Sequence, residues 1–130
     1  MQYLTKLFYF CAAHRYGHED WTAEKNTEVF GDDAKIHGHN YTLEITVKGS
    51  INPETGFIVD LVELKKIVKN NILGIMEHSQ IEKDIPWFKD KQPSSENMVV
   101  FIWEMIASKL IDCTLHRIRL IETPTIKTDY

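Results

Sequence analysis

Apolar and polar residues alternate in three segments of this chain, and a period of two is typical of β-strands with one buried face. Residues 2–13 alternate loosely and are rich in Tyr, Leu and Phe, which favour strands. Residues 39–49 contain the alternating run Thr-Leu-Glu-Ile-Thr-Val-Lys, and residues 115–121 alternate before a break at Pro124. The pattern predicts two strands near the N-terminus and a last strand or hairpin near the C-terminus.

Two segments between these strands carry apolar residues at helical spacing. Asp60 is suited to cap the first helix, and Glu63 completes a capping box. Ser94 or Ser95 is suited to cap the second helix, with Glu96 in its first turn. The apolar stripes are Leu61, Leu64, Ile67, Val68 and Ile72 in the first helix and Val99, Ile102, Met105, Ile106 and Leu110 in the second.

The remaining segments are predicted to be loops. Residues 16–36 are polar and are predicted to form a long loop with one helical turn, while residues 74–93 are irregular. The order ββααββ predicts a single α+β domain over residues 1–130, with two helices on one face of a four-stranded antiparallel sheet. Such a sheet has exposed edges, so we expect the chain to self-associate.

Composition narrows the classes of function. The 130 residues are 43% hydrophobic and 26% charged with a net charge of −4, which is typical of a soluble globular protein and argues against nucleic-acid binding. The sequence has no apolar run long enough for a membrane span, and its first residues lack the layout of a signal peptide. Cys11 and Cys113 form no disulfide framework and are interpreted as buried small apolar residues, so we expect a reducing cytoplasm.

The motif His37-Gly38-His39 stands at the start of the second predicted strand. Side chains at positions i and i+2 of a strand share one face, so the two imidazoles converge on one point and suit a zinc ion. His14, at the end of the first strand, is either an ordinary strand-end histidine or the third ligand. Three histidines would leave the zinc ion an open coordination position, which is the catalytic arrangement.

Two other residues have alternative interpretations. His78 follows Glu77 and is either a solvated loop histidine or an acid–base group held by that carboxylate. Glu122 interrupts an apolar stretch of the last strand, where a half-buried carboxylate needs a partner. That partner is either a structural donor or a ligand with adjacent N–H groups, such as the edge of a guanine-like ring.

Taken together, these residues resemble the 6-pyruvoyltetrahydropterin synthase family, including its 6-carboxytetrahydropterin synthase members. The resemblance covers nearly the whole chain. It rests on the motifs Phe10-Cys11-Ala12-Ala13-His14-Arg15, Val29-Phe30-Gly31, His37-Gly38-His39-Asn40-Tyr41, Met76-Glu77-His78, Pro93-Ser94-Ser95-Glu96-Asn97, Ile102-Trp103 and Ile121-Glu122-Thr123-Pro124.

The resemblance implies a tunnelling fold (T-fold), in which subunits join their sheets into a barrel and two trimeric rings form a homohexamer with active sites between subunits. It implies a Zn2+ cofactor and a pterin substrate, normally 7,8-dihydroneopterin triphosphate. The implied roles are zinc ligands for His14, His37 and His39, pterin binding for Glu122, Ser94, Ser95 and Glu96, and catalysis for His78 with Glu77.

One departure from the family affects the predicted reaction. The family places a catalytic cysteine in the loop before His-Gly-His, and the matching position here is Asp33 in the shorter form or Gly31 in the longer one. Members with glutamate at this position resemble enzymes that release 6-hydroxymethyl-7,8-dihydropterin for folate synthesis. Asp33 is therefore a candidate base, although Asp32-Asp33 also suits a polar turn and the loop holds further carboxylates at Glu24 and Glu28.

Overall fold

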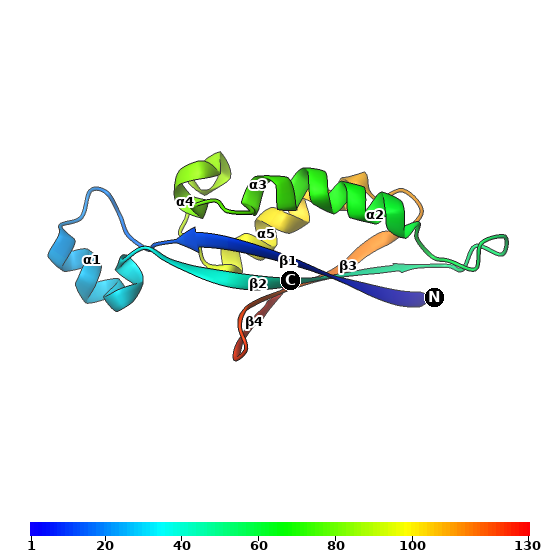
Figure 1. The fold of residues 1–130 in the computed structure, drawn as a ribbon, viewed down its shortest axis with the longest axis horizontal. Coiled ribbons are helices and arrows are strands. Elements are labelled where there is room, and N and C mark those ends of the chain that lie inside the picture. Colours follow the sequence, from blue (N-terminus) through cyan, green and yellow to red (C-terminus); the bar gives the residue numbers. More distant parts are fainter.

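The computed structural model describes residues Met1–Tyr130 and contains the predicted four-stranded antiparallel sheet (Figure 1). The strands are β1 (Gln2–His14), β2 (His37–Gly49), β3 (Thr114–Thr123) and β4 (Ile126–Asp129), hydrogen-bonded in the order β1-β2-β3-β4. The sequence pattern therefore predicted the sheet correctly, and the C-terminal element is a hairpin. The second strand begins at His37, two residues earlier than its alternation indicated.

The helices differ more from the prediction. They are α1 (Ala23–Phe30), α2 (Leu61–Val68), α3 (Gly74–Met76), α4 (Ile81–Asp84) and α5 (Ser95–Ile106). The first predicted helix corresponds to α2, which continues through a π-helical turn over Lys69–Leu73 into α3. None of the helices is long and apolar enough to cross a membrane.

Side-chain caps begin both main helices at the predicted places. Asp60 accepts a hydrogen bond from the backbone N–H of Val62 at 2.9 Å, and Ser94 accepts one from Asn97 at 3.2 Å. Of the two serines, Ser94 is thus the cap. The predicted capping box is not formed, because Asp60 bonds to Val62 and not to the N–H of Glu63, and the Glu63 carboxylate lies 3.3 Å from Lys66 Nζ.

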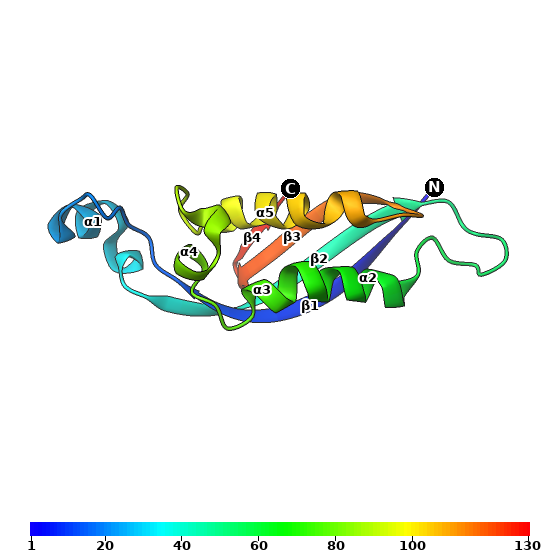
Figure 2. The same ribbon diagram turned by 90° about the horizontal axis from the view of Figure 1, so that it is seen from above.

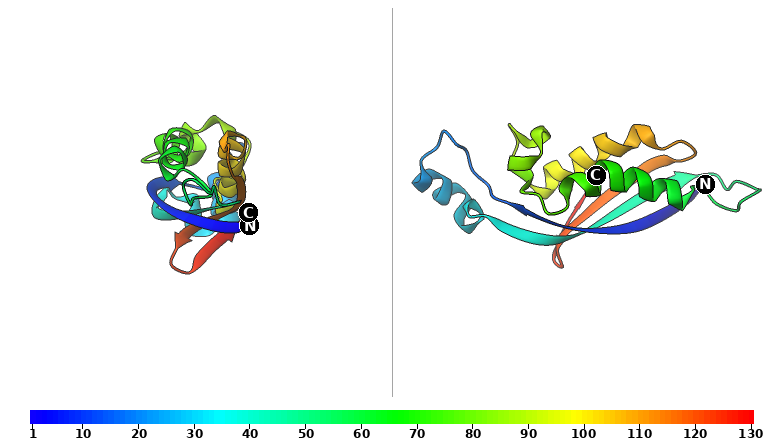
Figure 3. Two further views of the ribbon diagram at one scale, coloured as in Figure 1. Left: turned by 90° about the vertical axis from the view of Figure 1, so that its right-hand side faces the viewer. Right: turned by 45° about the horizontal axis from the view of Figure 1, so that its top comes forward.

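The helices α2, α3, α4 and α5 cover one face of the sheet, and the β3–β4 hairpin projects from the other side (Figures 2 and 3). Alternate residues of β1 and β2 face these helices, and together with the apolar stripes of the helices they form the core. The largest fully buried side chains are Tyr41, Phe88, Leu43, Ile45, Leu64, Ile72, Met76, Ile81, Met98, Ile102, Ile106 and Ile118. Cys113 packs against this core, but Cys11 is exposed on the uncovered face, so its predicted burial is wrong.

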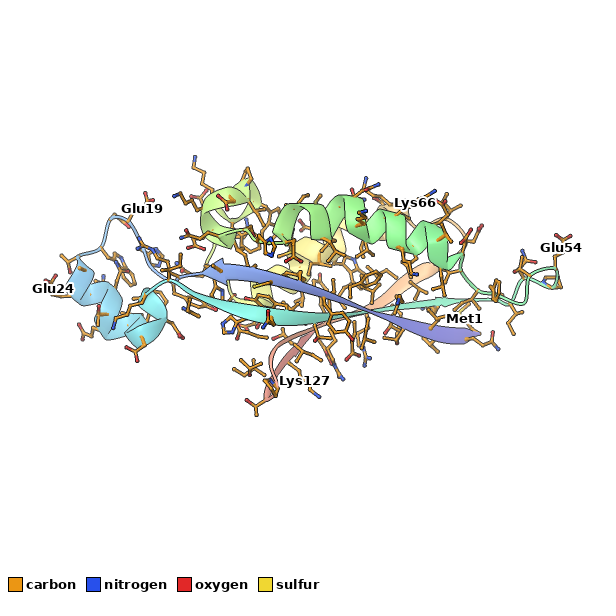
Figure 4. The ribbon with its side chains drawn as sticks, viewed as in Figure 1. Met1, Glu19, Glu24, Glu54, Lys66 and Lys127 are labelled. Atoms are coloured by element: carbon orange, nitrogen blue, oxygen red, sulfur yellow. The ribbon has the colours of Figure 1, made fainter.

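Residues 15–36 form an outlying lobe at the end of the sheet, with Glu19 and Glu24 at its outer side (Figures 1 and 4). The lobe contains more helix than the predicted long loop with one helical turn, namely α1 and a 3₁₀ helix over Gly31–Ala34. Thr22 caps α1, and the ring of Phe30 stacks on Trp21 at 6.1 Å and on Tyr16 at 5.8 Å. No residue of α1 is buried, so its few apolar residues leave no strong periodic signal in the sequence.

The edge of β1 is covered only near its end. The N–H of His78 donates to Cys11 O at 2.6 Å, and the N–H of Ala13 donates to Ser79 O at 2.8 Å. The earlier residues of this edge pair with no strand of the same chain. This free edge, with that of β4, agrees with the expected self-association.

Candidate metal centre and active site

Three imidazoles meet where β1 ends and β2 begins. The antiparallel register places His14 opposite His37 and Ala12 opposite His39. The side chains of His14, His37 and His39 point to the face that the helices cover, at the end of the core. Gly38 allows this close pairing, because a Cβ atom there would lie only 3.3 Å from the carbonyl oxygen of Ala12.

The donor set of the three histidines fits a zinc ion. One ring nitrogen from each lies within 4.8 Å of the others. His14 Nδ1 is 2.8 Å from Pro93 O, and His37 Nδ1 is 2.8 Å from Lys35 O. These carbonyl contacts leave both Nε2 atoms free to bind a metal ion. The Nε2 of His14 is buried with no hydrogen-bond partner, which is costly unless something binds it.

Burial keeps the central imidazole in the form that a metal needs. Desolvation lowers the pKa of His14, and the neighbouring rings of His37 and His39 lower it further, against the opposing effect of the Pro93 hydrogen bond. A neutral imidazole is the ligating form. Burial, and then the nearby Glu122 carboxylate, raise the pKa of Tyr41 and of Tyr16, so both phenols keep their protons.

Glu122 lies directly beside the three histidines. Its Oε1 is 3.7 Å from His14 Nε2 and 3.6 Å from His39 Nε2, and only 12% of its side chain is exposed. The half-buried carboxylate predicted from the apolar stretch of β3 therefore faces the imidazoles of His14 and His39. A group bound at the metal would lie within reach of this carboxylate.

Asp33 is the loop carboxylate that the structure brings to the same centre. Its Oδ1 is 3.9 Å from His37 Nε2, whereas the Asp32 side chain is fully exposed and lies 3.8 Å from Lys35 Nζ. Glu24 and Glu28 lie on α1, and neither forms an ion pair with any of the three histidines. The Asp33 side chain is 66% exposed and so remains open to a ligand.

The segment Ser94–Glu96 begins one residue after the carbonyl that holds His14. Ser95 is buried, and its hydroxyl bonds to Glu96 at 2.9 Å and to Thr128 of β4 at 2.8 Å. Ser94 is occupied as the cap of α5. Both serines thus hold α5 and β4 in place, and Glu96 is the exposed acidic residue of the three.

Glu77 and His78 form a pair, but not at the metal centre of the same chain. His78 Nε2 is 3.1 Å from Glu77 Oε1, and the His78 side chain is 82% exposed. The pair lies at the β1 edge beside Cys11, roughly 10 Å along the strand from His14. His78 has φ of 58°, a left-handed conformation uncommon for a residue with a side chain. Its neighbours hold this strained backbone, which is a feature of functional sites.

Sequence reasoning missed the residues that support the centre through their backbone. Pro93 contributes a carbonyl oxygen to His14, and Lys35 contributes one to His37. It also missed Tyr16 and Tyr41, whose rings lie 5.1 Å and 6.5 Å from that of His14. For Tyr41 a signal existed, because it continues the alternation of His37 and His39 along the same face.

Comparison with known proteins identifies the family. The family model of 6-pyruvoyl tetrahydropterin synthase matches residues 3–130. The chain belongs to this family. It is 37% identical over 123 residues to the 6-pyruvoyl tetrahydrobiopterin synthase of Poecilia reticulata, an alignment that covers 93% of this chain and 84% of that protein. Relatives with this name are enzymes, so the family is a family of pterin synthases.

Solved structures show the same fold. The 6-pyruvoyl tetrahydropterin synthase of Caenorhabditis elegans superposes with a TM-score of 0.90 at 30% identity, covering 99% of this chain and 94% of that one. A Plasmodium vivax 6-pyruvoyltetrahydropterin synthase shares the fold with a TM-score of 0.65 at 17% identity, covering 100% of this chain and 98% of that one. The latter is a catalytic-residue mutant in which glutamate is replaced by alanine.

Replacing His37 by Ala is expected to abolish tight zinc binding, because it removes one of three converging nitrogens. Loss of an outer-shell partner of a zinc ligand already weakens binding by about 10–100-fold, so we expect at least about 100-fold here. Zinc content after dialysis and competition with a chelator measure this. His116→Ala, an exposed histidine outside the centre, is the matched control. A structural zinc site would also lose much thermal stability with its metal. Equal zinc binding by the two variants would contradict the assignment.

The metal-free protein is expected to lose stability as the pH falls below 6.5, the ordinary pKa of histidine. The folded state lowers the pKa of His14, so the unfolded chain takes up the proton first and acid favours unfolding. Urea denaturation of the metal-free protein at several pH values between 7.5 and about 5 measures the slope of the free energy of unfolding against pH. The slope should be smaller in His14→Gln and unchanged in His116→Ala. Parallel curves for wild type and His14→Gln would refute this.

Proposed function

We propose that this protein is a zinc-dependent lyase that acts on 7,8-dihydroneopterin triphosphate, eliminating triphosphate and rearranging the side chain of the pterin. The observation that carries the proposal is the buried, unpartnered Nε2 of His14, which lies among two further imidazoles and the Glu122 carboxylate. Membership of the pterin synthase family supports this substrate class.

Each group near the centre has a proposed role. A zinc ion held by His14, His37 and His39 would polarise side-chain oxygens of the substrate and acidify the neighbouring C–H. Glu122 accepts hydrogen bonds from adjacent N–H groups of the pterin ring. Ser94, Ser95 and Glu96 line the pterin pocket. The helices exclude water from the side of the centre that they cover.

Acid–base catalysis is assigned to the Glu77–His78 pair and to Asp33. Because Glu77 and His78 lie at the β1 edge of their own chain, we propose that they serve the metal centre of a neighbouring subunit. This fits a homohexamer in which sheet edges pair into a barrel and active sites lie between subunits. We also propose that the protein is located in the cytoplasm.

A second candidate function follows from the Asp33 carboxylate, 3.9 Å from His37 Nε2. In this branch Asp33 replaces the family cysteine and the enzyme cleaves the side chain to give 6-hydroxymethyl-7,8-dihydropterin for folate synthesis. An acidic catalytic residue also occurs in the Plasmodium vivax protein of the same fold, which supports the chemistry. A third candidate is a zinc- and pterin-binding protein without catalysis, if no carboxylate replaces the thiol.

Incubation of the zinc-loaded protein with 7,8-dihydroneopterin triphosphate is expected to consume the substrate. Separation of the pterin products then distinguishes the candidates. A 6-pyruvoyl or 6-carboxy product selects the standard reaction, and 6-hydroxymethyl-7,8-dihydropterin selects the folate branch. Tight pterin binding that Glu122→Gln weakens, without turnover of wild-type protein, would select the binding protein and refute the enzyme. Released triphosphate provides an independent measure of elimination.

Asp33→Asn is expected to lower kcat by at least about 100-fold, the range for loss of an acid–base group, because the amide cannot take up a proton. Zinc content and pterin binding should be unchanged. Asp32→Asn is the matched control, since the neighbouring carboxylate is fully exposed and pairs only with Lys35. Unchanged turnover of Asp33→Asn would remove Asp33 from the mechanism.

A further inference from the structure

The outlying lobe of residues 15–36 is held to the helical part of the subunit mainly by hydrogen bonds. A cavity of about 560 Å³ lies between the two, lined by Arg15, His18 and Asn26 from the lobe and by Glu82 and Lys89 from the opposite side. None of the residues of α1 is buried. Apolar packing across this gap is therefore small, and the position of the lobe depends on the polar contacts that span it.

Two amides at the start of the lobe form contacts across the gap, and the amide between them forms a contact within the lobe. The N–H of Arg15 donates to Glu82 Oε1 at 3.1 Å, and the N–H of Gly17 donates to Gln92 Oε1 at 3.0 Å. Between them, the N–H of Tyr16 donates to the carbonyl oxygen of Asp33 at 2.9 Å. The strand that leaves the metal centre is thus fixed to the helical part on both sides of the residue that holds Asp33.

Gln92 makes the stronger of the two attachments. Its amide pairs with Gly17 in both directions, because Nε2 also donates to Gly17 O at 2.9 Å. Its own carbonyl accepts from Asn97 Nδ2 at 2.9 Å, which ties Gln92 to α5. The next residue is Pro93, whose carbonyl contacts the metal ligand His14. One dipeptide therefore positions both a metal ligand and the lobe.

We propose that Gln92 is a positioning residue that sets the place of Asp33 at the metal centre through the path Gln92–Gly17–Tyr16–Asp33. The proposal rests on the proposed function, because it gives Asp33 its catalytic use. The path itself is a property of the chain and is tested separately. Gln92 does not contact the three histidines, so its replacement should move the carboxylate and not remove a ligand.

The first experiment measures amide hydrogen exchange of the zinc-loaded full chain. Gln92→Ala is expected to speed exchange of the Gly17 and Tyr16 amides at least tenfold relative to wild type, roughly 1.4 kcal/mol of local opening. The core amide of Ile45 should be unaffected. Gln2→Ala, at an exposed glutamine, is the matched control. Gln92→Glu keeps the acceptor for Gly17 N–H and loses the donor, so it should be intermediate and serves if Gln92→Ala does not fold. Unchanged exchange at Gly17 and Tyr16 would overturn the proposal.

The second experiment is a double-mutant cycle on turnover. Gln92→Ala should lower kcat about tenfold or more with little change in KM, since misplacing a catalytic group by about 1 Å can cost 100-fold. In the Asp33→Asn background it should cause no further loss. Equal losses in both backgrounds would show that Gln92 does not act through Asp33. If the wild-type protein converts no pterin, the proposed function fails, and the exchange experiment alone still confirms or refutes the path.

Discussion

The site depends on the antiparallel register of β1 and β2. A slip of one residue between these strands would turn His14 away from His37 and His39, because the side chains of a strand alternate between faces. The same register places Phe10 opposite Tyr41, whose stacked rings lie 4.9 Å apart at the end of the core. Burial of apolar residues on the helix-covered face thus fixes the register, and the register in turn brings the imidazoles together.

This arrangement also explains why the centre is poised for a metal. Desolvation of the buried His14 imidazole lowers its pKa, and repulsion from the nearby rings of His37 and His39 lowers it further. Its outward nitrogen has no partner within the protein. A bound cation would satisfy this atom, whereas the folded chain alone leaves it unsatisfied.

The sequence predicted the parts of this fold that follow from local periodicity and failed where tertiary contacts decide. The four strands, the cap at Asp60, the choice of Ser94 or Ser95 as the second cap, and the cluster of three histidines follow from spacing and side-chain chemistry. The outlying lobe does not follow from spacing, because α1 is exposed and its Phe30 ring stacks on Tyr16 and Trp21, which lie outside the helix. Nor could spacing show that the Glu77–His78 pair lies at a strand edge, since that depends on pairing between residues 66 positions apart. Backbone groups such as Pro93 O carry no signature in the sequence at all.

In the proposed mechanism Asp33 takes the place where the family resemblance implies a cysteine thiol, and this changes what the protein must supply. A carboxylate is ordinarily a much weaker base than a thiolate, so Asp33 has little intrinsic driving force for taking a proton from carbon. Effective proton transfer then depends on placing its oxygen close to the reacting atom, where good orientation alone can contribute several kcal/mol. The side chain is largely exposed and short, and the backbone carbonyl of Asp33 accepts a hydrogen bond from the N–H of Tyr16. In the proposed mechanism the reactivity of Asp33 therefore depends on the geometry of the lobe more than on the acidity of its carboxyl group.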